Sequence, residues 1–76
     1  MTKYQVGDVV SYLAFGGVHR LVLVTNKESD IKNGRSGFDG ILVDEFTHQP
    51  IEAGEYGNGV WGYDDQILAV RKLQHA

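Results

Sequence analysis

Cysteine is absent from this chain, and several other residue types that shape a fold are rare. Without cysteine, neither disulfides nor thiolate metal sites can stabilise it. Proline and tryptophan each occur once, and the longest apolar runs, Leu21 to Val24 and Ile67 to Val70, are too short to cross a bilayer. We therefore expect 76 residues (1–76) to form one small domain that depends on its own core or on a partner for stability.

Basic residues are also few, since seven lysines and arginines face ten aspartates and glutamates, for a formal charge of −3. A general nucleic-acid binder carries a basic excess, so the balance disfavours that class. The charge is uneven: residues 1–35 hold five basic and three acidic groups, and residues 36–76 hold two basic and seven acidic groups. The opening sequence, MTKYQVGDVV, lacks the apolar stretch of a signal peptide, so we expect a cytoplasmic protein without a membrane partner.

Glycine, by contrast, is abundant: ten of the 76 residues are glycine, nearly twice the average usage of about 7%. Short apolar runs separated by glycine turns are typical of small β barrels and sandwiches. Residues 9–15 and 18–26 are rich in β-branched and aromatic side chains and predict two strands. Gly16-Gly17 between them can adopt the positive φ of a two-residue hairpin turn, so we expect a β-hairpin here.

The rest of the chain alternates polar segments with further strands. Residues 26–37, NKESDIKNGRSG, are polar apart from Ile31, and predict a long, partly ordered loop with a turn at Asn33-Gly34. Gly40 in the next strand marks a bulge or bend, and Phe38, Leu42 and Phe46 add apolar contacts there. The elements expected from this point are a strand over 38–46, a polar segment over 47–59, a strand over 60–63, a helical turn over 64–66, a strand over 67–73 and a frayed tail over 74–76.

This order of elements resembles small SH3-like barrels of the KOW and Tudor kind. The resemblance is carried by the VGDVV entry, the bent strand after a glycine-rich segment, and the helical turn followed by ILAV. It implies an all-β fold, a single, partly open, five-stranded SH3-like barrel. DIKNGRSGFDG (30–40) and VWGYDDQI (60–67) also resemble segments of uncharacterised small proteins of actinobacterial phages, which implies an accessory role without a known activity.

No motif for catalysis or for metal or cofactor binding emerges from the sequence. The histidines, His19, His48 and His75, lack the spacing of metal ligands. Ser36 lacks the final glycine of a nucleophile elbow, and Gly34-Arg35-Ser36-Gly37 precedes a strand, not the helix that follows the GXXG loop of a KH domain. Asp44-Glu45 and Asp64-Asp65 are neighbours that point to opposite faces of a strand, and one of the latter pair is expected to cap the helical turn. We therefore expect a protein that is not an enzyme and has no cofactor or metal.

The aromatic and basic residues provide the candidate binding site. A core this small needs about half of the eight aromatic side chains, and the remaining tyrosine and tryptophan side chains favour interfaces. Trp61 is expected in the core, with an exposed binding position as the alternative, and Tyr4, Tyr56 and Tyr63 are expected on the surface. Arg35 is the preferred contact of the polar loop, because its planar guanidinium can clamp a carboxylate or stack on a tyrosine. The candidate binding residues are Lys27, Lys32, Arg35, Tyr56, Trp61 and Tyr63.

These patterns favour a small non-enzymatic module that binds another protein. Open strand edges and loops supply docking surfaces on small barrels. A weak nucleic-acid-binding module of the KOW kind is one alternative, supported by the basic loop residues Lys27, Lys32 and Arg35, with Arg20 and Lys3 expected nearby. The other alternative is a self-associating structural protein, in which a homo-oligomer stabilises a marginal monomer.

Overall fold

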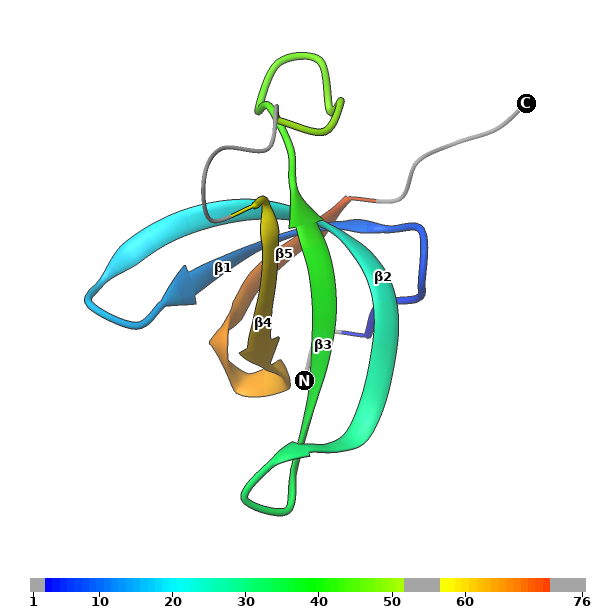
Figure 1. Cartoon of the computed structure of the whole chain (residues 1–76), viewed down its shortest axis with the longest axis vertical. Helices are drawn as coiled ribbons and strands as arrows, with labels where there is room; N and C mark the ends of the chain where they lie inside the picture. The colour runs from blue at the N-terminus through cyan, green and yellow to red at the C-terminus, as the bar shows by residue number, and fades with distance from the viewer. Residues whose placement is uncertain (1–2, 52–56, 72–76) are drawn as a thin grey trace.

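The computed structural model describes residues 3–51 and 57–71, which fold into one antiparallel sheet (Figure 1). Its order is β4-β3-β2-β1-β5, so β4 and β5 are the two ends of a sheet that does not close. The expectation of an all-β, five-stranded chain is confirmed. The elements are β1 (Val9–Ala14), β2 (Val18–Lys32), β3 (Arg35–Leu42), β4 (Gly59–Tyr63), the 3₁₀ turn η1 (Asp64–Gln66) and β5 (Ile67–Arg71).

The expected hairpin of β1 and β2 forms at Gly16-Gly17, but its loop also includes Phe15 and is one residue longer than the expected two-residue turn. Gly16 and Gly17 have φ values of 85° and 79°, which strain residues with a Cβ. The Gly17 N–H donates to the Ala14 carbonyl oxygen at 3.1 Å and closes the turn. Ala14 therefore pairs with Val18, and Phe15 lies just beyond the end of β1.

The long loop expected over residues 26–37 is wrong. β2 continues to Lys32 and β3 begins at Arg35, so Asn33-Gly34 alone makes the turn, with φ values of 58° and 74°. Figure 1 shows β2 as a long curved strand that leaves β1 and continues beside β3. The segment is polar because both of its faces are largely exposed, and cross-strand hydrogen bonds keep it extended without an apolar pattern.

The bulge expected at Gly40 lies on the neighbouring strand. The register of β2 against β3 shifts between Val24 and Asn26, opposite Gly40 and Asp39. A bulge bends its own strand, and here it lies where β2 has left β1 for β3. Gly40 instead permits close packing, because a Cβ there would lie 2.2 Å from Val22 Cγ1.

The core cluster contains two tyrosines and one phenylalanine, and a third tyrosine, Tyr63, is buried outside that cluster. Tyr4 and Tyr12 contact Phe38 edge to face, with ring centroids 5.8 and 5.2 Å apart. Tyr4 is 2% exposed and Tyr63 is 6% exposed, so their expected surface positions are wrong. Both hydroxyls take part in hydrogen bonds, which allows a tyrosine to be buried. The core cluster comprises Tyr4, Val10, Tyr12, Val22, Val24 and Phe38.

The strand expected over 38–46 ends earlier, at Leu42. A turn follows, in which an Asp44 carboxylate oxygen accepts the backbone N–H groups of Phe46 and Thr47. The Thr47 and Phe46 hydrogen bonds hold the pKa of Asp44 below its usual value. Phe46 is consequently 86% exposed at this turn and adds no core contact, contrary to expectation.

The remaining sequence expectations end near the boundaries of the described residues. The helical turn over 64–66 and the strand over 60–63 are confirmed, the latter beginning one residue earlier at Gly59. The last strand is described to Arg71, and its expected end at 73 and the tail over 74–76 lie outside the described residues. Within residues 3–51 and 57–71, no helix has the length and apolar character needed to span a bilayer.

Candidate functional site: an aromatic face beside the edge of the sheet

Three aromatic rings from two distant segments pack together on the outer surface of the sheet. Phe15 follows β1, and its ring centroid lies 5.6 Å from that of Trp61 and 6.2 Å from that of Tyr63. The Trp61 and Tyr63 centroids are 5.3 Å apart and their planes are nearly perpendicular. Phe15 remains 64% exposed, and Trp61 is partly exposed and lies outside the core cluster in which it was expected. Tyr63 is 6% exposed, so solvent reaches mainly the other two rings. We call Phe15, Trp61 and Tyr63 the aromatic face.

Alternation along β4 separates these rings from the core. Trp61 and Tyr63 pair with Asp39 and Gly37, whereas the intervening Gly62 pairs with the buried Phe38. A Cβ on Gly62 would lie 2.9 Å from Phe38 Cζ and 3.0 Å from Tyr12 Cε2. The glycine thus brings β4 against the core aromatics on one side, and its neighbours display their rings on the other.

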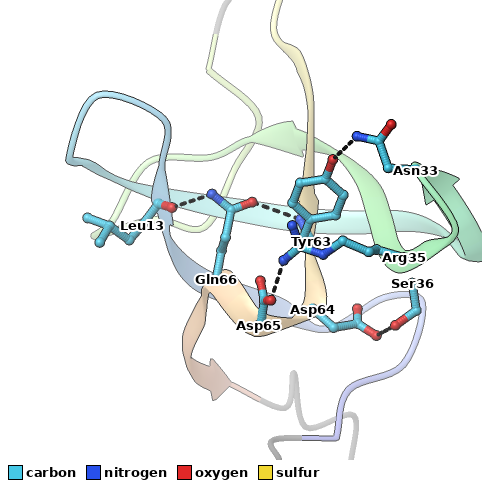
Figure 2. A network of polar contacts seen from close by, with 8 residues as sticks. All are labelled: Leu13, Asn33, Arg35, Ser36, Tyr63, Asp64, Asp65 and Gln66. Carbon is cyan, nitrogen blue, oxygen red and sulfur yellow. Dashed lines mark hydrogen bonds and ion pairs between the residues drawn. The ribbon is translucent and has the colours of Figure 1, made fainter.

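Hydrogen bonds hold Tyr63 in place from both sides. Figure 2 shows the Asn33 amide donating to the Tyr63 hydroxyl at 3.2 Å. The Tyr63 N–H donates to Gln66 Oε1 at 2.8 Å, and Gln66 Nε2 donates to the Leu13 carbonyl oxygen at 2.8 Å. The β2–β3 turn, β4, η1 and β1 are thereby connected around one ring, which fixes the aromatic face.

Two basic side chains lie over the aromatic face. The Arg35 guanidinium carbon is 3.8 Å from the Tyr63 ring centroid, and Lys32 Nζ is 5.3 Å from the Trp61 ring centroid. Arg35 also forms an ion pair with Asp65, and the two side chains are 49% and 66% exposed. An ion pair this exposed contributes about 0–1 kcal/mol to stability, so the arrangement orients Arg35 more than it stabilises the fold.

The carboxylates of η1 therefore do not cap the turn, contrary to expectation. Tyr63 occupies the N-cap position. Asp64 accepts hydrogen bonds from the hydroxyls of Tyr4 and Ser36, the latter at 2.7 Å. Burial, and then the hydrogen bond to Asp64, raise the pKa of Tyr4 well above its usual value. Asp64 thus attaches η1 to β3 through Ser36 and to the segment before β1 through Tyr4.

Four of the six candidate binding residues predicted from the sequence come together here: Lys32, Arg35, Trp61 and Tyr63. Lys27 lies elsewhere, with its Nζ 4.5 Å from the Tyr4 ring centroid and donating to the Tyr4 carbonyl oxygen at 2.8 Å. Tyr56 lies outside the described residues. The structure brings these four residues together, and the part that each plays in binding stays a prediction.

A cleft of about 310 Å³ lies beside the aromatic face, between β4 and the β1–β2 hairpin. Its only charged lining residue is Arg20, which pairs with Tyr12 across the hairpin and for which no ion pair is found within the described residues. Burial raises the pKa of Tyr12, and the positive charge of Arg20 opposes this shift. We call this hollow the β4 cleft; its lining residues are Tyr12, Ala14, Phe15, Arg20, Gly59, Val60 and Trp61.

Phe15 is the ring of this site that the sequence patterns did not identify, and Arg20 was considered only as a neighbour of the candidate nucleic-acid contacts. Phe15 shares the alternation of the first strand with Val9 and Leu13, so its pattern resembles that of a core residue. Its position directly before Gly16-Gly17 was the available signal, because the tip of a hairpin leaves the core. Nothing in the sequence assigned Arg20 to a cleft, since a lone arginine within a strand is usually solvated.

A second hollow of about 390 Å³ is lined by apolar residues of β2, β3 and the segment after β3, together with His19, Arg20, Asp44 and Glu45. Among residues 3–51 and 57–71, no group of three or more histidine and acidic side chains is arranged to hold a metal ion.

Comparisons of the chain with protein-family models, with curated proteins and with solved structures find no match.

Proposed function

We propose that this chain is a non-enzymatic module that binds another protein through the aromatic face and the β4 cleft. The observation that carries the proposal is the packing of the 64% exposed Phe15 against Trp61 and Tyr63 beside a cleft. Aromatic side chains that are rigid, partly exposed and next to a concavity are the usual anchors of protein interfaces. Exposing such an apolar cluster to water is unfavourable unless a partner covers it.

An SH3-like, partly open barrel is the proposed architecture. Its support is the element order, in which a long bent β2 pairs with both β1 and β3 and a 3₁₀ turn separates β4 from β5. The tip of the β1–β2 hairpin, the β2–β3 turn and β4 then contribute to one surface, where loops held by a rigid sheet form the contacts.

A non-enzymatic role is supported by what the polar groups near the site already bind. Asp64 accepts two hydroxyl groups, and Asp65 pairs with Arg35. A general base has to reach a substrate proton, and these carboxylates instead join elements of the fold. The resemblance to small phage proteins is the ground for proposing an accessory role, in the cytoplasm, toward a host protein or a phage assembly component.

A protein partner is favoured over nucleic acid by the charge at the site. Asp65 neutralises Arg35, which leaves Lys32 and Arg20 as the cations beside the rings. The whole chain carries a charge of −3, which repels a polyanion. Nucleic-acid bases can stack on exposed rings, so single-stranded nucleic acid is the competing ligand to be tested.

Selection from a displayed library of random dodecapeptides tests this proposal. The fluorescence of Trp61, the sole tryptophan, should change when a selected peptide binds. Phe15→Ser should weaken that binding at least about tenfold, because an aromatic anchor contributes about 1.4 kcal/mol or more. Phe46→Ser, which alters the more exposed phenylalanine outside the site, is the matched control and should leave binding unchanged.

Three outcomes would contradict the proposal. The first is a library that yields no binder, and the second is binding that Phe46→Ser weakens as much as Phe15→Ser does. In the third, an oligo-dT single strand alone changes the Trp61 fluorescence, with an affinity that falls steeply as salt is raised. Concentration-dependent self-association lost in Phe15→Ser would instead assign the aromatic face to a homo-oligomer.

A further inference from the structure

We infer that the free edge of β4 takes up an extended segment of the partner protein as an additional strand. This inference rests on the proposed function and names the manner in which the β4 cleft is filled. β4 ends the sheet and pairs only with β3 among the described strands. An unpaired strand edge is a template for another strand, and proteins commonly cover or shorten such edges.

Two hydrogen bonds show which backbone groups face this edge. The Leu42 N–H donates to the Asn58 carbonyl oxygen at 2.9 Å, so Asn58 faces β3. The Tyr63 N–H donates to the Gln66 side chain instead, so Tyr63 faces away from β3. Backbone groups alternate sides along a strand, and therefore Gly59 and Trp61 direct their N–H and C=O groups to the free edge.

The β4 cleft lies along this edge and limits the added strand to a short segment. Gly59, Val60 and Trp61 form one wall, and Tyr12, Ala14 and Phe15 lie on the side of the β1–β2 hairpin. Gln66 already occupies the edge at Tyr63, and the contact between Phe15 and Trp61 lies next to it. The backbone groups of Gly59 and Trp61 are those left for an incoming strand, which matches a segment of about three residues at about 3.3 Å each.

The cleft also specifies the chemistry of that segment. Its aromatic lining fits one apolar side chain, and Arg20 is its only charged residue. A guanidinium binds a carboxylate through two parallel hydrogen bonds. The backbone of an added strand points toward β4, so the carboxylate has to come from an aspartate or glutamate side chain. Side chains two residues apart share a face, and the segment therefore has an apolar residue and an acidic residue in that spacing.

Amide hydrogen exchange of the complete chain, with and without the tightest selected dodecapeptide, tests strand addition directly. The amide protons of Gly59 and Trp61 should exchange at least about tenfold more slowly in the complex, because they become hydrogen-bonded. The amide protons of Val60 and Gly62 already face β3 and should change little. If Phe15→Ser weakens the complex but the amide protons of Gly59 and Trp61 exchange no more slowly in it, strand addition is wrong and the proposed function stands.

A matched pair of substitutions at Gly59 gives a second test. Gly59→Pro removes the edge N–H at the first residue of a strand, where proline is tolerated, and Gly59→Ala keeps it. A Cβ at Gly59 meets nothing within 4 Å, so the alanine methyl group has room. We expect the proline variant to bind the peptide about tenfold more weakly than the alanine variant, with both folded by thermal unfolding. Equal affinity of the two folded variants would contradict the inference, and the exchange experiment decides it if the proline variant does not fold.

The acidic preference is tested at Arg20. Arg20→Gln should weaken the binding of a peptide that contains an acidic residue by about tenfold. The affinity for the same peptide with glutamine in place of that residue should be unchanged. Arg71→Gln, at an arginine outside the cleft, is the control and should alter neither. Selected peptides without an acidic residue, or equal losses in both variants, would reject the assigned chemistry. A library without binders would count against the proposed function itself.

Discussion

At the scale of single residues, glycine sets how closely β3 lies to β2. A Cβ at Gly40 would lie 2.2 Å from Val22 Cγ1 and 2.5 Å from the Leu23 carbonyl oxygen. The second of these atoms belongs to the backbone and cannot rotate away. The position therefore needs glycine for space, and its φ is not in the left-handed region.

Gly40→Ala should lower the free energy of unfolding by about 1–3 kcal/mol or more, because it overpacks the contact between β2 and β3. Gly59→Ala, another strand glycine, has no atom within 4 Å of its new Cβ and should change stability by no more than about 0.5 kcal/mol. Urea denaturation of both variants measures the difference. Equal midpoints would show that the close approach at Gly40 is not a constraint.

Tyr4 is a second residue whose environment has a measurable consequence. Burial raises its pKa above the ordinary value near 10, and so does the hydrogen bond to Asp64. Above that ordinary value the unfolded chain loses the proton more readily than the folded chain does. The unfolded state then binds fewer protons, and stability falls as the pH rises.

Stability should therefore be constant from neutral pH to about pH 9 and fall above about pH 10. In Tyr4→Phe this alkaline loss should be smaller, although the variant is less stable at neutral pH because two hydrogen bonds are missing. Tyr12 keeps its own raised pKa and accounts for part of the remaining slope. Chemical denaturation between pH 7 and 11.5 tests this, and an unchanged slope in Tyr4→Phe would assign the alkaline loss to other groups.

At the scale of elements, both tight turns are defined by positive φ angles. Gly16 and Gly17 adopt values of 85° and 79°, and a Cβ at either position has no neighbour within 4 Å. Any cost of substitution there comes from the backbone conformation and not from a clash. The two-residue turn of β2 and β3 also has positive φ at Asn33 and Gly34, and the Gly34 N–H donates to Asp30 Oδ1 at 2.8 Å.

Replacement of both Gly16 and Gly17 by valine should destabilise the protein by roughly 1–3 kcal/mol, because β-branched residues are strained at positive φ. Gly17→Asn is the control, since asparagine tolerates the left-handed region, and it should have a small effect. Thermal unfolding of the two variants makes the comparison. A valine variant as stable as the asparagine variant would mean that the turn adopts another geometry.

The two hairpins show which elements the sequence could predict. The first has apolar strands on both sides of its glycines, so its pattern and its turn agree. The second hairpin includes NKESDIK (26–32), whose polar side chains carry no periodic signal. Its strands are held by the pairing of Lys27 with Phe38 and of Glu28 with Gly37. Only the turn at Asn33-Gly34 was predictable, because cross-strand hydrogen bonds are a tertiary property that leaves no pattern in a solvated segment.

At the scale of the whole molecule, the candidate site is assembled from segments far apart in the sequence. The pattern of aromatic and basic residues nominated Lys32, Arg35, Trp61 and Tyr63 separately, and the sheet brings them to one surface. Their internal partners were not predictable, because Arg35 meets Asp65 and Tyr63 only after β3, β4 and η1 have come together. Lys27 was misplaced for the same reason, since its position depends on the path of the segment that contains Tyr4.

The uneven charge of the sequence also acquires a spatial meaning. The acidic residues Asp64 and Asp65 lie in η1 and bind groups from β3 and from the segment before β1. They therefore join the basic first half of the chain to its acidic second half. Arg20 remains the cation facing the β4 cleft, which is why the cleft, and not Arg35, is assigned the carboxylate of a partner.

Whether the aromatic face binds a partner is decided by the dissociation constant of one selected peptide, measured for Phe15→Ser and Phe46→Ser side by side. Both substitutions remove an exposed phenylalanine, and only Phe15 belongs to the aromatic face. Phe15→Ser should raise the dissociation constant at least about tenfold, and Phe46→Ser should leave it within about twofold of the unsubstituted protein. Equal values for the two variants, or a loss confined to Phe46→Ser, would contradict binding at this face.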